Sequence, residues 1–177
     1  KLYEFQPASE QPVIIDGGAH IGLASLYFAR RHPRATIHAF EADPKIAELL
    51  AANVRAFDLA QVQVHGEALW TENGSVSFDA TADDSGHVAA SGAAVGAKRP
   101  ASVPATRLRD FLAGQPRPID LLKLDIEGAE FAVLKDCDGA LGRVQNLLIE
   151  VHRFRDGEAG EICPRAHVRK RYNRSVA

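Results

Sequence analysis

Val13-Ile14-Ile15-Asp16-Gly17-Gly18-Ala19-His20-Ile21-Gly22 is the stretch that decides the fold of this chain. An apolar run ends in Asp16, glycines stand at positions 17, 18 and 22, and an apolar helical pattern begins after them. This order is typical of a buried strand that turns sharply into a helix, and the glycines let a ligand approach the backbone closely. The positive end of the helix dipole would then face that ligand.

A second acid follows the loop at a distance that suits a nucleoside. The apolar run 35–40 ends in Glu41. An acid at the tip of the second strand, roughly 20 residues beyond the glycines, is placed to accept hydrogen bonds from ribose hydroxyls. We therefore expect a cofactor that contains a nucleoside. The simpler interpretation is that Asp16 only caps the helix and the glycines only form a tight turn.

The residues of the loop also indicate which of two cofactors binds. A dinucleotide fingerprint has glycine where this chain has Ala19. A carboxylate at Asp16 would repel a pyrophosphate, whereas it would attract the sulfonium and ammonium groups of S-adenosylmethionine. The sequence therefore favours S-adenosylmethionine over NAD. An NAD-dependent oxidoreductase is the alternative, although the chain has no Tyr-x-x-x-Lys pair for that chemistry.

Length and composition predict a single domain. The chain has 177 residues, 46% of them hydrophobic, and a formal net charge of -2. This charge offers no general attraction to nucleic acid or to an anionic membrane, and no apolar run is long enough to span a bilayer. The two cysteines, Cys137 and Cys163, form no CxxC pair, so we expect reduced thiols and a cytoplasmic location. The chain starts at Lys1 without methionine, which suggests a processed product or a fragment.

Strand and helix patterns alternate along the chain, as a parallel sheet with crossover helices requires. We expect strands at 13–16, 36–41, 62–65, 119–124 and 145–152, and helices at 21–31, 44–57, 107–113 and 127–137. Asp43-Pro44 predicts the start of the second helix. The predicted fold class is α/β with a mostly parallel, doubly wound sheet. We expect residues 1–177 to form one domain with its core at about 10–153 and a polar, basic tail at 154–177.

The middle of the chain departs from this alternation. Two short strand patterns, 68–71 and 75–78, flank Glu72-Asn73-Gly74, which predicts a hairpin turn. Residues 101–106 are expected to pair back onto the hairpin. The long polar loop between them, 80–100, is either a functional lid or a mobile, solvated segment.

A second motif gives the sequence a family resemblance. The run Leu122-Lys123-Leu124-Asp125-Ile126-Glu127-Gly128-Ala129-Glu130 closes the fourth strand, and Leu148-Ile149-Glu150-Val151-His152 closes the fifth. With the Asp-Gly-Gly-Ala-His-Ile-Gly loop and Phe40-Glu41-Ala42-Asp43-Pro44, these runs resemble the FkbM family of S-adenosylmethionine-dependent methyltransferases. The resemblance covers about residues 10–153 and implies the Rossmann-like fold of class I methyltransferases.

The resemblance also implies an activity and the roles of individual residues. The activity is methyl transfer to a hydroxyl oxygen of a small molecule, a sugar, or a glycan or natural-product acceptor. The residues implied to bind the cofactor are Asp16, Gly17, Gly18, Ala19, His20, Gly22, Glu41, Ala42, Ala68 and Asp125. The candidate bases are Asp125, Glu127 and His152. For Asp125 we favour a role in orienting the cofactor or stabilising its charge.

Two features depart from the family pattern. Residue 20 is His where the family often has Asn, and both side chains donate or accept hydrogen bonds. Only a polar tail follows His152, whereas this fold normally adds two further strands, so either the native chain continues or this tail is atypical, and the sequence shows no pattern for the last strands of the sheet. A non-catalytic S-adenosylmethionine-binding module is the resulting alternative. No metal-ligand spacing is visible, and Mg²⁺ held by the clustered acids is a weaker alternative.

Overall fold

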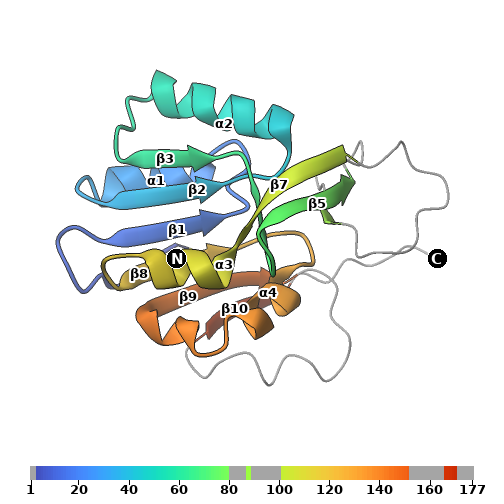
Figure 1. The fold of residues 1–177 in the computed structure, drawn as a ribbon. Coiled ribbons are helices and arrows are strands. Elements are labelled where there is room, and N and C mark those ends of the chain that lie inside the picture. The colour runs from blue at the N-terminus through green and yellow to red at the C-terminus, as the bar shows by residue number, and fades with distance from the viewer. Residues whose placement is uncertain (1–2, 80–86, 89–100, 152–165, 171–177) are drawn as a thin grey trace.

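Two sheets flanked by helices make up the described part of the chain (Figure 1). The computed structural model describes residues 3–79, 87–88, 101–151 and 166–170. The larger sheet has six strands in the order β10-β9-β8-β1-β2-β3, and every pair of neighbours in it is parallel. The doubly wound α/β fold expected from the sequence is therefore confirmed.

The elements of the larger sheet follow the predicted alternation. The strands are β1 (Val13–Gly17), β2 (Thr36–Phe40), β3 (Val62–His65), β8 (Ile119–Leu124), β9 (Val144–Val151) and β10 (Ala166–Lys170). The helices are α1 (Leu23–Arg31), α2 (Pro44–Ala56), α3 (Leu108–Gly114) and α4 (Glu130–Asp136), with a short 3-10 helix at Ala140–Arg143. The predicted strands all lie within about one residue of their expected bounds, which is within the usual uncertainty of strand ends.

The central position of β1 creates the place for a ligand. From β1 the chain builds β2 and β3 on one side of the sheet, and later β8 and β9 on the other. The strand order therefore reverses between β1 and β8. In open α/β sheets, ligands bind at the carboxyl ends of the strands beside such a reversal.

Alternate residues of β1 face opposite layers of helices. Ile14 belongs to a core that includes Phe28 of α1 and residues of α2. Ile15 belongs to a second core with Leu108 of α3 and Val133 of α4. Because side chains alternate along a strand, one helix layer covers each face of the sheet. Figure 1 shows α3 and α4 on the face toward the viewer.

Asp43 and Pro44 begin α2 as the sequence predicts. The Asp43 carboxylate accepts hydrogen bonds from the backbone N–H groups of Lys45 and Ile46, at 2.8 and 3.3 Å. Pro44 occupies the first helical position, where no N–H donor is needed. This cap fixes the direction in which the chain leaves β2, directly after Glu41.

The hairpin predicted around Glu72-Asn73-Gly74 is wrong. β4 (Ala68–Trp70) and β5 (Gly74–Asp79) both pair with β7 (Ala101–Arg107), which lies between them in a smaller sheet of order β4-β7-β5-β6. Asn73 supplies the physical reason. Its Oδ1 accepts a hydrogen bond from the N–H of Arg107 at 2.9 Å, and its Nδ2 donates to Asp110 at 2.8 Å. These bonds tie the turn to the start of α3 instead of closing a hairpin.

The predicted pairing of 101–106 with 75–78 is confirmed, because β7 runs antiparallel to β5. β6 (His87–Val88) extends this sheet beyond β5. In Figure 1, β5 and β7 project beyond the larger sheet. The rest of the predicted polar loop, 80–86 and 89–100, lies outside the described residues.

A strand follows β9 that the sequence did not predict. Residues 166–170 form β10, which pairs in parallel with residues 147–151, so β9 has a neighbour on both sides. The segment Ala-His-Val-Arg-Lys is too polar to stand out as a strand, but charged residues are common on edge strands. The other parts of the predicted tail, 154–165 and 171–177, lie outside the described residues. In the described ranges, no helix has the length and apolar character needed to cross a membrane.

Candidate functional site

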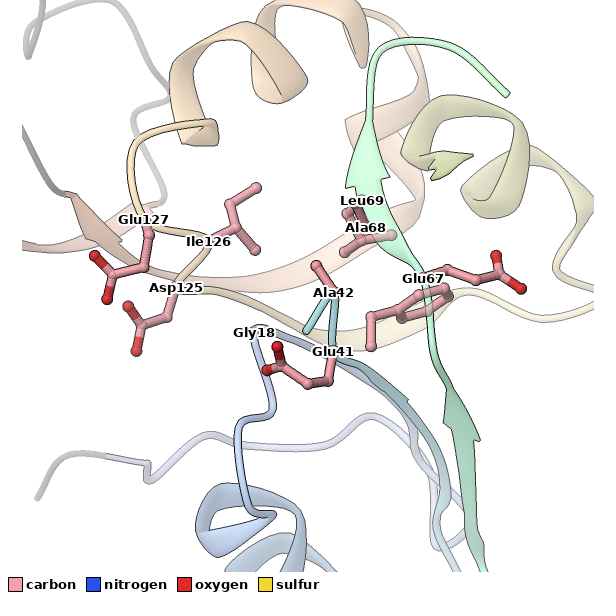
Figure 2. Close-up of a pocket in the computed structure, with 10 residues that line it drawn as sticks. Gly18, Glu41, Ala42, Glu67, Ala68, Leu69, Asp125, Ile126 and Glu127 are labelled. Carbon is pink, nitrogen blue, oxygen red and sulfur yellow. The ribbon is translucent and has the colours of Figure 1, made fainter. Parts of the chain in front are cut away.

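A pocket of about 430 Å³, open to solvent, lies at the carboxyl ends of β1, β2 and β8 (Figure 2). Its lining residues are Gly18, Phe40, Glu41, Ala42, Glu67, Ala68, Leu69, Asp125, Ile126 and Glu127. Figure 2 shows Asp125 and Glu127 together on one side and the apolar Ala68 and Leu69 on the other. The topology therefore brings acids and apolar surface together where a ligand was expected.

Six of the predicted site residues line this pocket. They are Gly18, Glu41, Ala42, Ala68, Asp125 and Glu127. The other four lining residues had no predicted role, although each is adjacent in sequence to a predicted site residue; they are Phe40, Glu67, Leu69 and Ile126. The carboxylate of Glu67 points away from the other acids in Figure 2 and accepts a hydrogen bond from the Thr106 hydroxyl.

Glu41 links the end of β2 to the glycine loop. One of its carboxylate oxygens accepts a hydrogen bond from the N–H of His20 and the other from the N–H of Asp43, both at 2.9 Å. Burial raises the pKa of the Glu41 carboxyl, and the two backbone donors lower it in part. Because each carboxylate oxygen has two lone pairs, the anchored group can still accept hydrogen bonds from a ligand.

Asp16 is fully buried and does not line the pocket. Its Oδ2 accepts a hydrogen bond from the Ser25 hydroxyl at 2.7 Å, and its Oδ1 lies 2.9 Å from the ammonium group of Lys123. That ammonium also donates to the carbonyl oxygens of Gly17 and Gly18, at 3.2 and 3.0 Å. The pair thus holds the backbone of the glycine loop against β8. Sequence reasoning assigned no role to Ser25 or Lys123.

The charge of Lys123 is maintained by its surroundings. Burial lowers the pKa of this ammonium, but the carboxylates of Asp16 and Asp125 raise it by more, so the pKa lies above its ordinary value. Lys123 Nζ lies 4.0 Å from the nearer Asp125 oxygen. One buried cation therefore contacts the loop after β1 and lies close to the loop after β8.

Backbone conformation explains two residues of the glycine loop. Gly18 has a φ of +70°, and a Cβ there would lie 1.8 Å from the carbonyl oxygen of Asp125. Glycine is therefore required by the contact between the two loops, whatever the ligand. His20 has a φ of 52°, in the left-handed region where Asn, Asp and His are enriched among non-glycine residues. This conformation explains why His can stand where the resembled family often has Asn.

The other loop residues predicted to bind a cofactor shape the turn and do not line the pocket. Gly17 ends β1, and Gly22, with a φ of 95°, directly precedes α1. The N–H of Ala19 donates to the carbonyl oxygen of Phe40 at 2.9 Å. Their backbone groups set the position of Gly18 and of the exposed His20.

The loop after β8 presents Asp125 and Glu127 in a constrained turn. Glu127 has a φ of 54°, which is unusual for a non-glycine residue. The buried carboxylate of Glu130 accepts hydrogen bonds from the N–H groups of Ile126, at 2.9 Å, and Gly128, at 2.9 and 3.2 Å. This turn is the reason that α4 begins at Glu130 and not at the predicted residue 127.

An aromatic cluster lies under the pocket at the ends of β2 and β3. Phe40 stacks on the His65 ring with a centroid distance of 4.3 Å, and Phe111 of α3 packs edge-on against Phe40 at 5.0 Å. Nδ1 of His38 lies 3.1 Å from Nε2 of His65. Burial and then the facing His65 lower the pKa of His38 to about 4, and burial also lowers the pKa of His65. Both rings are therefore neutral at pH 7, and one donates to the other.

The third predicted base, His152, lies outside the described residues. In the part of the chain that the structure describes, no group of three or more His, Cys, Asp or Glu side chains is arranged to hold a metal ion. Cys137 is a buried free thiol, and burial raises its pKa to about 12.

Known proteins resemble this chain over most of its length. The family described as Methyltransferase FkbM domain matches residues 16–170. Methyltransferase 1 of Beauveria bassiana (strain ARSEF 2860) is 29% identical over 173 residues, which cover 85% of this chain and 69% of that protein. Methyltransferase sdnD of Sordaria araneosa is 31% identical over 180 residues, which cover 84% of this chain and 69% of that protein.

A solved structure shares the fold. The crystal structure of methyltransferase FkbM from Methylobacillus flagellatus KT matches with a TM-score of 0.53 and 17% sequence identity. The match covers 77% of this chain and 32% of that one, so the chain spans about a third of the length of that structure. The family match extends over most of the chain, from the buried Asp16 to β10, and the chain therefore belongs to the FkbM methyltransferase domain family.

Proposed function

We propose that this methyltransferase uses S-adenosylmethionine and methylates a hydroxyl oxygen. The observation that carries the choice of cofactor is the Glu41 carboxylate, which lines the pocket and is anchored 2.9 Å from the backbone nitrogen of His20. An acid at this strand tip suits the hydroxyls of a ribose. S-adenosylmethionine, when bound, supplies the methyl group from its sulfonium. Family membership argues against the alternative of an NAD-dependent oxidoreductase.

The residues of the pocket fit such a cofactor. Glu41 would accept hydrogen bonds from the ribose, and Ala42 and Ala68 would border the adenine with apolar surface. The methionine portion would be held by the loop residues Gly17, Gly18, Ala19, His20 and Gly22. Asp16 forms an ion pair with Lys123 at 2.9 Å, so we assign Asp16 to positioning the loop and not to direct contact with the sulfonium.

A hydroxyl acceptor loses its proton as its oxygen gains the methyl group, so a base is needed nearby. Asp125 and Glu127 line the same pocket, and either carboxylate could take that proton. His152 is the third candidate. We favour an orienting role for Asp125, because it borders the glycine loop through its carbonyl contact with Gly18. Alignment of the reacting groups can supply much of the rate enhancement.

Transfer of a radiolabelled methyl group to a panel of neutral hydroxyl compounds tests the proposal. We expect Asp125→Asn to lower kcat by about 100-fold or more because the reacting groups lose their alignment, and Glu127→Gln to lower it by a comparable factor if Glu127 is the base. Asp58→Asn, which neutralises an exposed carboxylate after α2, is the matched control and should leave the rate unchanged.

Two results would contradict parts of this account. A near-normal rate of methyl transfer in Asp125→Asn would contradict the orienting role proposed for Asp125. Binding of S-adenosylhomocysteine without transfer to any hydroxyl compound would favour the alternative of a non-catalytic binding module.

A further inference from the structure

The outer face of α2 exposes two large apolar side chains to solvent. Leu49 is 52% exposed, and Phe57, which directly follows the helix, is 47% exposed, whereas Leu50 on the inner face is fully buried. In Figure 1, α2 lies at the margin of the fold beside β3, the edge strand of the larger sheet. Single exposed apolar residues are common on protein surfaces, so they do not by themselves indicate a partner. The charged residues around them decide what this face can bind.

The exposed residues of α2 form a single stripe along the helix. Four of them recur at intervals of four, three and four residues and therefore lie on one side of the helix. They are Lys45, Leu49, Ala52 and Ala56. This is the spacing of the contact line between two helices that pack side by side. Glu48 and Arg55 are seven residues apart, so both flank the same side of this stripe.

The charges along this face complement themselves when the direction of the helix is reversed. From the amino end to the carboxyl end, the exposed charged residues alternate in sign; they are Lys45, Glu48, Arg55 and Asp58. Lys45 and Asp58 lie equally far from the midpoint between residues 51 and 52, and so do Glu48 and Arg55. A second α2 that runs antiparallel across this midpoint therefore meets each charge with the opposite charge. A second α2 that runs parallel in register would meet like with like.

These charges are available to a partner. Within the described ranges, none of the four side chains forms an ion pair, although Lys45 and Glu48 are only three residues apart on the helix. Complementary charges at the rim of an interface favour the matching partner and disfavour partners that bring like charges together. The partner that matches this order of charges is the same face of another α2.

We propose that the outer face of α2 is a self-complementary interface, on which a second copy of this chain docks with its own α2 antiparallel. Two-fold symmetry forms each charge pair twice, around a centre made by Leu49 and Ala52. The small side chain of Ala52 lets the two helix backbones approach closely. One helix face is small for a stable dimer, so the dissociation constant should be on the order of 10–100 µM. None of these residues lines the pocket around Glu41, so the proposal is independent of the proposed function.

Sedimentation of the full chain at concentrations from about 1 to 500 µM, with charge-reversal variants, tests this proposal. Glu48→Arg and Arg55→Glu each bring like charges together at both symmetric contacts, and each should weaken the dimer at least about ten-fold. An equal mixture of the two variants should associate as tightly as the wild-type chain, because every contact then joins opposite charges again. Unfolding of a variant could not produce this recovery.

Glu72→Arg is the matched control, because it reverses an exposed carboxylate outside α2 and should dimerise like the wild-type chain. Circular dichroism checks that the helices are intact in each variant. Both α2 variants should bind S-adenosylhomocysteine as the wild-type chain does.

Four results would overturn the proposal. A wild-type chain that is monomeric at every concentration would show that a different partner, or none, covers this face. A dimer that neither α2 variant weakens would have another interface, such as the edge strand β3 or β10. Failure of the mixed variants to associate would contradict the antiparallel register. Equal weakening by Glu72→Arg would show that charge in general, and not this face, controls association.

Discussion

Replacement of Lys123 by methionine should destabilise this protein strongly. The variant leaves the Asp16 carboxylate, 0% exposed, without the ammonium that lies 2.9 Å away. At that distance and an effective dielectric constant of about 20, Coulomb's law gives about 6 kcal/mol of attraction, part of which offsets the cost of burial. Breaking such a pair from one side costs about 3–5 kcal/mol. Lys123→Met should therefore lower the free energy of unfolding by that amount.

Urea unfolding followed by circular dichroism measures this loss, and the chain offers a matched control. Arg34 and Glu10 also form an ion pair, at 2.7 Å, but their side chains are 61% and 79% exposed. Arg34→Met should therefore cost only about 0–1 kcal/mol, although its ion pair is the shorter one. The difference between the two variants isolates the effect of burial.

The double variant Asp16→Asn/Lys123→Met removes both charges and should recover much of the stability lost in Lys123→Met. It also shows whether the buried charge, and not the lost side-chain volume, is the cause. A loss below about 1 kcal/mol in Lys123→Met, equal to that in Arg34→Met, would refute the reasoning. So would a double variant that is no more stable than the single one.

Three further predictions follow from local geometry. Gly18→Ala should lower the free energy of unfolding by more than about 1 kcal/mol in urea and abolish binding of S-adenosylhomocysteine, because residue 18 has a φ of +70° and a Cβ there would clash with the Asp125 carbonyl oxygen. Gly114→Ala is the control and should leave the free energy of unfolding nearly unchanged, because nothing lies within 4 Å of a Cβ at that position. The free energy of unfolding should fall by up to about 3 kcal/mol as the pH drops from about 6.5 to about 4, because His38 is protonated at its ordinary pKa in the unfolded chain and only near pH 4 in the folded chain. Urea unfolding at several pH values should show a weaker pH dependence of stability for His38→Gln, and an unchanged pH dependence would contradict the lowered pKa of His38. Asp43→Ala should cost about 1 kcal/mol by thermal unfolding, because it removes the cap of α2, and an unchanged midpoint would contradict that role.

The larger sheet and much of the pocket could be predicted because their signals are local. The apolar run before Asp16, the glycines after it and Glu41 at the next strand tip all lie within about 30 residues, and the topology of parallel sheets brings strand ends to one edge. Gly18, Glu41 and Asp125 accordingly meet in the pocket. Gly18 was predicted because glycine lets a ligand approach the backbone, whereas in the structure glycine is required there because a Cβ would clash with the Asp125 carbonyl oxygen.

The parts that could not be predicted depend on partners distant in sequence. Lys123 interrupts an apolar strand, which is the visible signal of a buried charge, but only the fold identifies Asp16 as its partner. Glu72-Asn73-Gly74 has the composition of a hairpin turn. Only the hydrogen bond from the N–H of Arg107 to the Asn73 side chain shows that this turn is tied to the end of β7. Strand β10 is too polar for periodicity to reveal it.

The pocket around Glu41 is proposed to hold S-adenosylmethionine. Calorimetric titration of the chain with S-adenosylhomocysteine, with NADH run alongside, tests this proposal most directly. We predict micromolar binding of S-adenosylhomocysteine, about ten- to hundred-fold weaker binding in Glu41→Ala, and unchanged binding in Glu48→Ala, whose side chain is exposed on α2. Absence of binding by the wild-type chain, tighter binding of NADH, or full affinity in Glu41→Ala would contradict the account.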